Sequence, residues 1–85
     1  MEGFLEIKKD SARFSSWSTK YFILVNELIT CCNNKGGKVE FRMHAELIDL
    51  NVTSSDRDFI IHTGIDTFCM RANSKQTKAE WISAM

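Results

Sequence analysis

Polar turns interrupt this chain at short intervals up to residue 73, and this spacing constrains the fold more than any other feature. The segments between the turns alternate apolar and polar residues, or are rich in aromatic and β-branched residues, which is typical of strands. The clearest turn, residues 33–37, contains Asn and Gly, which tolerate positive φ. Residues 45–49 fit either a turn or a short strand. We expect seven strands, at residues 3–9, 17–25, 28–32, 38–43, 50–53, 58–63 and 67–72.

After residue 73 the pattern becomes that of a helix. Ser74 is a suitable N-cap for it. Trp81 and Met85 lie four residues apart and share one helical face. Such a helix must bury its Trp81 face against one end or edge of the strands. We therefore predict a mainly β fold with one C-terminal α-helix, in which two packed antiparallel sheets form a seven-stranded sandwich or barrel and the helix caps it.

The composition excludes several classes of protein. Eighty-five residues suffice for one domain, residues 1–85. Eleven basic and eleven acidic side chains give a net charge of zero, which argues against a nucleic-acid binder. The apolar runs are far shorter than the roughly 20 residues of a membrane span, and Glu2 and Glu6 interrupt any signal-peptide core. Three cysteines without a CxxC pair favour neither disulfides nor zinc, and they fit a reducing, cytoplasmic setting.

Three segments share their order and spacing with a known family. They are Gly-Phe-Leu at residues 3–5, Trp-Ser-Thr-Lys-Tyr-Phe-Ile-Leu at residues 17–24, and the pair 59–61 and 68–74 followed by Trp81 in a helix. Together they resemble the pleckstrin-homology (PH) domain. Residues 23–32 are similar to the strand-turn-strand of PH domains in Dbl-family Rho guanine nucleotide exchange factors. The family's helix usually runs further, so residues 1–85 look like a domain excised from, or truncated within, a larger multidomain protein.

The resemblance implies where a ligand would bind. Phosphoinositide-binding members carry a basic residue late in the first strand and two more in the second, and these converge on a headgroup phosphate. The matching positions here are Ile7, Ser18 and Lys20, of which only Lys20 is basic. Lys9 has the same parity as Ile7 and could replace it imperfectly. The two losses predict weak binding without stereospecific recognition of a headgroup.

Side chains of two kinds complete the expected layout. Basic residues that we expect at the loop end, where they would attract an anionic leaflet in a salt-sensitive way, are Lys8, Lys9, Arg13, Lys20, Lys35 and Lys38. The alternative is that these are ordinary solvated loop charges. The expected structural core consists of Leu5, Phe22, Leu24, Phe59, Phe68 and Trp81.

No catalytic motif is present in the sequence, so we expect no enzyme and no cofactor. Cys31 and Cys32 would point to opposite faces of a strand, and His44 and His62 are single imidazoles, so we expect no metal site. The leading hypothesis is a monomeric, cytoplasmic regulatory module with weak affinity for anionic phospholipid at the inner face of the plasma membrane. The alternative is a protein-interaction module without lipid affinity, which would use a sheet face or the exposed side of the helix.

Overall fold

The computed structural model describes residues 1–9, 16–64 and 66–85. It confirms the seven expected strands and the helix, and it shows that residues 45–49 form a short 3-10 helix followed by the start of a strand. The elements in chain order are β1 (Glu2–Lys9), β2 (Ser18–Val25), β3 (Leu28–Cys32), β4 (Val39–His44), η1 (Ala45–Leu47), β5 (Asp49–Val52), β6 (Asp58–His62), β7 (Thr67–Arg71) and α1 (Lys75–Ala84).

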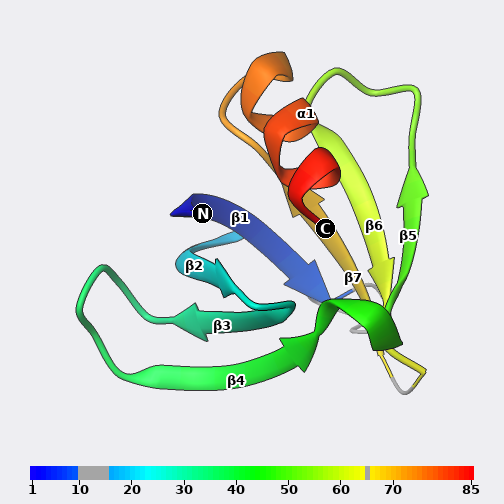
Figure 1. Ribbon diagram of the computed structural model, residues 1–85. Coiled ribbons are helices and arrows are strands. Elements are labelled where there is room, and N and C mark those ends of the chain that lie inside the picture. The colour runs from blue at the N-terminus through cyan, green and yellow to red at the C-terminus, as the bar shows by residue number, and fades with distance from the viewer. Residues whose placement is uncertain (10–15, 65) are drawn as a thin grey trace.

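The strands form one continuous antiparallel sheet in the order β4-β3-β2-β1-β7-β6-β5. The start of β1 pairs with β2, and the end of β1 pairs with β7. The two expected layers are therefore halves of a single sheet that share β1, as Figure 1 shows. β4 and β5 lie at the two ends of the strand order, so the barrel is not closed by hydrogen bonds between them.

The core lies between the two halves of the sheet and is covered at one end by α1 (Figure 1). Ser74 caps the helix, since its hydroxyl accepts a hydrogen bond of 3.1 Å from the backbone N–H of Thr77. Trp81 is 1% exposed and packs edge-on against Phe22, with 6.5 Å between ring centroids. Leu5, Leu24 and Phe59, which were expected in the core, are buried as well, as is Phe22.

Phe68 differs from the other expected core residues, because it is only partly buried. It stacks on Phe41 of β4, with 5.6 Å between centroids and 7° between ring planes. Both rings line a cavity beside the end of η1, where β4 has no strand partner on its outer side. The incomplete closure of the barrel leaves Phe68 at the margin of the core.

Candidate functional site

The loop end of the barrel is formed by the end of β1, the start of β2, the β3–β4 turn (residues 33–38) and the β6–β7 turn. Ile7 lies directly opposite Ser18 in the β1–β2 ladder, and Leu5 lies opposite Lys20. Ile7 and Ser18, two of the positions that match the family's basic residues, therefore lie side by side on neighbouring strands. Ser18 is exposed, but Ile7 is only 7% exposed and belongs to the core. The β1 position that is basic in headgroup-binding members is thus filled here by a core residue.

Lys20 is already bound by groups of the protein itself. Its ammonium lies 2.8 Å from a carboxylate oxygen of Glu40 in β4. It also donates a hydrogen bond of 3.3 Å to the side-chain carbonyl of Asn33. A phosphate oxygen that bound Lys20 would therefore compete with this carboxylate.

Lys9 is paired in a similar way, since its ammonium lies 3.0 Å from a carboxylate oxygen of Asp66. The Lys9 side chain is 49% exposed, so solvent screens this ion pair and it adds little stability. The two basic residues with the parity expected for a headgroup site, Lys9 and Lys20, each have a carboxylate partner from another part of the barrel. This arrangement lowers the positive field at the loop end.

Lys8 has the opposite parity and lies on the outer face of the sheet, away from Lys20. Its ammonium is 5.0 Å from the centroid of the Trp17 ring, and the guanidinium of Arg71 is 4.2 Å from the same centroid. Arg71 also donates to both carboxylate oxygens of Asp58, at 2.8 and 3.1 Å. These contacts hold Trp17 next to the start of β2. Lys8 therefore packs against Trp17 on the outer face of the sheet.

The Arg71–Asp58 pair predicts a pH dependence of stability. The hydrogen bonds from Arg71 hold the pKa of the Asp58 carboxyl below its usual value. A carboxyl with a lowered folded-state pKa stabilises the protein above its unfolded pKa, and that contribution is lost as the pH falls through the folded value. We expect Asp58→Asn to lower the free energy of unfolding at neutral pH, and the difference from wild type to shrink below about pH 4.

Urea unfolding of wild type and Asp58→Asn at several pH values measures this difference. Asp49→Asn, at an exposed carboxyl, is the control. A difference that does not change with pH would contradict the prediction.

Lys35 and Lys38 are exposed in the β3–β4 turn. The turn is held by a backbone hydrogen bond of 2.8 Å from Gly37 to Asn34 and by one of 3.0 Å from Asn33 to Lys38. A Cβ at Gly37 would lie 2.3 Å from Oδ1 of Asn34 and 3.0 Å from its backbone oxygen, so a larger residue there would displace the Asn34 side chain and crowd this carbonyl. The turn thus presents two lysines to solvent beside the Lys20–Glu40 pair. Arg13 lies outside the described residues.

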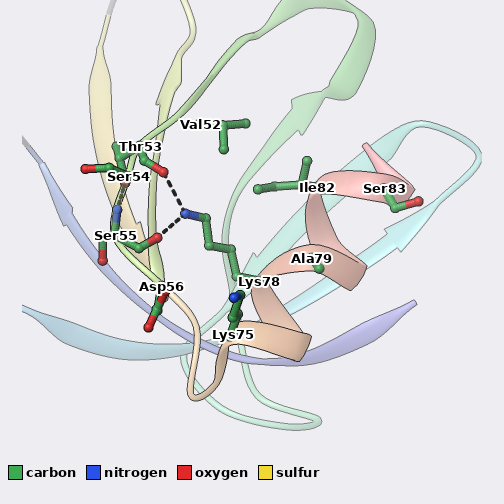
Figure 2. A pocket seen from close by; sticks show the side chains of 10 residues that line it. All are labelled: Val52, Thr53, Ser54, Ser55, Asp56, Lys75, Lys78, Ala79, Ile82 and Ser83. Atoms are coloured by element: carbon green, nitrogen blue, oxygen red, sulfur yellow. Dashed lines mark hydrogen bonds between the residues drawn. The ribbon is translucent and has the colours of Figure 1, made fainter.

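A groove between α1 and the β5–β6 connection was not predicted from the sequence. Figure 2 shows the Lys78 ammonium at its base, where it donates hydrogen bonds to the backbone carbonyls of Thr53, at 3.1 Å, and of Ser55. The groove has a volume of about 500 Å³, and Val52, Ala79 and Ile82 supply its apolar lining. The signal in the sequence was Lys78 beside the buried Trp81 face, but its carbonyl partners can be identified only from the fold.

The bent sheet and its single helix place the chain in the class of small β-barrel domains. The family model described as the PH domain matches residues 1–85, and the chain therefore belongs to the PH domain family. PH domains are generally non-catalytic modules. A search of curated proteins finds no match.

Solved structures share the fold at low sequence identity. The C-terminal PH domain of pleckstrin in complex with D-myo-Ins(1,2,3,5,6)P5 is 21% identical, with a TM-score of 0.78, and the alignment covers 99% of this chain and 88% of that one. The tandem PX-PH domains of Bem3 from Saccharomyces cerevisiae are 13% identical, with a TM-score of 0.83 and coverage of 98% and 39%. Vav1 bound to an allosteric inhibitor is 17% identical, with a TM-score of 0.80 and coverage of 99% and 16%.

Three further findings concern the described residues. Among residues 1–9, 16–64 and 66–85, no helix has the length and apolar character needed to cross a membrane. The same part of the chain contains no group of three or more His, Cys, Asp or Glu side chains placed to hold a metal ion. Cys31 is buried, and this burial raises the pKa of its thiol to about 12, so the reactive thiolate is scarce at neutral pH.

Proposed function

We propose that this PH domain is a non-catalytic regulatory module that binds anionic phospholipid weakly through its loop end. It works inside a larger cytoplasmic signalling protein, such as a Rho guanine nucleotide exchange factor, and contacts the inner face of the plasma membrane. The similarity of residues 23–32 to Dbl-type PH domains supports this context. The fold shared with a pleckstrin domain in complex with an inositol pentakisphosphate supports the ligand class.

The observation that carries this proposal is which lysines at the loop end are paired with carboxylates and which are exposed to solvent. Lys9 and Lys20 are paired with carboxylates, whereas Lys35 and Lys38 are exposed on the adjacent turn. Exposed lysines attract an anionic surface without selecting a headgroup, at roughly 1 kcal/mol each. Binding should therefore follow the total charge of the membrane more closely than the isomer of the lipid.

We expect binding to vesicles that contain phosphatidylserine to fall several-fold between about 50 and about 150 mM salt, because screening shortens the reach of exposed charges. Cosedimentation with vesicles of phosphatidylcholine alone, with added phosphatidylserine, and with a phosphoinositide at equal total charge measures this. Lys35→Glu with Lys38→Glu should abolish binding. Arg57→Glu with Lys75→Glu changes the net charge equally at exposed sites near the opposite end of the barrel, and should have a much smaller effect.

Two results would contradict this proposal. One is equal loss of binding in the two double variants, which would show that only the net charge of the protein matters. The other is strong preference for one phosphoinositide at physiological salt, which would show that Lys9 and Lys20 exchange their carboxylate partners for a headgroup.

A further inference from the structure

β5 is an edge strand, and among the described residues no strand pairs with its outer side. It pairs with β6 over all four of its residues and stands last in the strand order. Within the described residues, no backbone hydrogen bond is made across the outer edge of Asp49–Val52. Such an edge presents alternating N–H and C=O groups, which only another extended chain can match in register. Its four residues span about 13 Å.

The groove lies between α1 and the β5–β6 connection, and it reaches the end of β5 at Val52. Val52 is 56% exposed at its side, and Ile82 and Ala79 face it from the helix, as Figure 2 shows. An extended chain that pairs with β5 would point every second side chain toward these apolar groups. The helix surface thus supplies a side-chain pocket next to a free backbone edge.

The charge at the base of the groove indicates what kind of chain fits. Lys78 is only 7% exposed, and within the described part of the chain no carboxylate lies within ion-pair distance of its ammonium. The two carbonyls that it contacts carry only partial charges, and an ammonium has three protons to donate. Lys75 adds a second positive charge to the lining, and among the residues that the structure describes Asp56 is the single acidic one there. A buried cation without a carboxylate favours an acidic partner.

We propose that the groove between α1 and the β5–β6 connection, together with the adjoining outer edge of β5, binds an extended, acidic segment of a partner protein. The segment adds to the outer edge of β5 as a strand of about four residues. It packs apolar side chains against Val52 and Ile82, and it directs a carboxylate toward Lys78 and Lys75. This surface lies at the end of the barrel that α1 covers, away from the β3–β4 turn, so this binding does not depend on the proposed lipid contact.

The test begins with selection of random peptides displayed on phage against the 85-residue chain. We expect the selected peptides to alternate apolar residues and to contain Asp or Glu. Synthetic copies of them, titrated into the isotope-labelled protein, should shift the backbone amide signals of residues 49–56 and 75–83. Replacing the acidic residues of each peptide by their amides should weaken binding about tenfold in wild type and much less in Lys78→Met.

A matched pair of variants tests the position of the site. Val52 and Val25 are 56% and 57% exposed, and they lie on β5 and β2. Val52→Asp should lower the affinity for the selected peptides at least about tenfold, whereas Val25→Asp should leave it unchanged. Lys75→Ser, which leaves the Lys78 contacts in place, should weaken the acidic preference even if Lys78→Met does not fold.

Several outcomes would overturn the proposal. They are a selection that enriches no peptide, peptides that shift signals at the β3–β4 turn or along β4 instead, and equal effects of Val52→Asp and Val25→Asp. A dimer of the free protein that Val52→Asp abolishes would show that a second copy of the chain covers the edge instead. Loss of vesicle binding in Lys35→Glu with Lys38→Glu would leave this result untouched, so the two proposals fail separately.

Discussion

Trp81→Ala is expected to unfold the domain or to leave it at the margin of stability. Trp81 is the largest fully buried side chain, and its ring meets Phe22 of β2 edge-on. Replacing a buried tryptophan by alanine costs about 3–5 kcal/mol, because apolar contacts are lost and a cavity remains. Natural domains have about 5–15 kcal/mol of stability, and a chain of this size lies toward the lower end.

The helix makes this effect larger. α1 has only ten residues, and so short a helix is marginal in water unless it packs against other elements. Its other buried residue is Lys78, which ties it to the β5–β6 connection. Thermal and urea unfolding followed by circular dichroism measure the loss. Glu80→Ala, at an exposed position beside Trp81, should leave the midpoint nearly unchanged. An unchanged midpoint for Trp81→Ala would contradict the packing described above.

The second large effect is a gain of affinity. Ser18→Arg with Glu40→Gln is expected to raise the affinity for inositol hexakisphosphate at least tenfold, the equivalent of ~1.4 kcal/mol. Glu40→Gln removes the negative charge that holds the Lys20 ammonium at 2.8 Å, and the amide that replaces it keeps a similar shape. Ser18 is exposed and two residues from Lys20 on the same strand, so an arginine there would point to the same face. Ile7 stays as it is, because it is part of the core.

Calorimetric titration of the folded variant measures this gain, and adding Lys20→Ala should abolish it. The control is Ser54→Arg with Glu46→Gln, which changes the net charge equally at exposed positions outside the loop end. Equal gains in the two double variants would show that attraction depends only on net charge. The Lys20–Glu40 pair would then have no role in selecting ligands.

The backbone of this domain was predictable because its signals are local. Residues 18–25 are rich in aromatic and β-branched side chains, which is typical of a strand, and in a strand Lys20 lies on the same face as Phe22 and Leu24. Ser74 marks the start of α1 because its hydroxyl satisfies a free N–H of the first turn. These patterns depend only on neighbouring residues, and all seven strands and the helix followed from them.

The candidate sites were less predictable because they depend on residues far apart in the chain. Glu40 of β4 reaches Lys20 of β2 across the intervening strand β3. Asp66 reaches Lys9 of β1 from the connection between β6 and β7. Neither pairing could be inferred before the strand order was known. Phe68 was expected in the core, but it is only partly buried against it, and this depends on how β4 ends the sheet.

The position of β1 has a consequence for how the protein is made. β1 leaves the ribosome before the other strands of the domain, yet its end pairs with β7, where Lys8 lies opposite Cys69. The core of the nascent chain must therefore wait for its last strand, and then for α1, before Trp81 can cover it. At a synthesis rate of about 5–20 residues per second, the unpaired side of β1 stays open for seconds. During translation this side of β1 can form its ladder only after β7 has been synthesised.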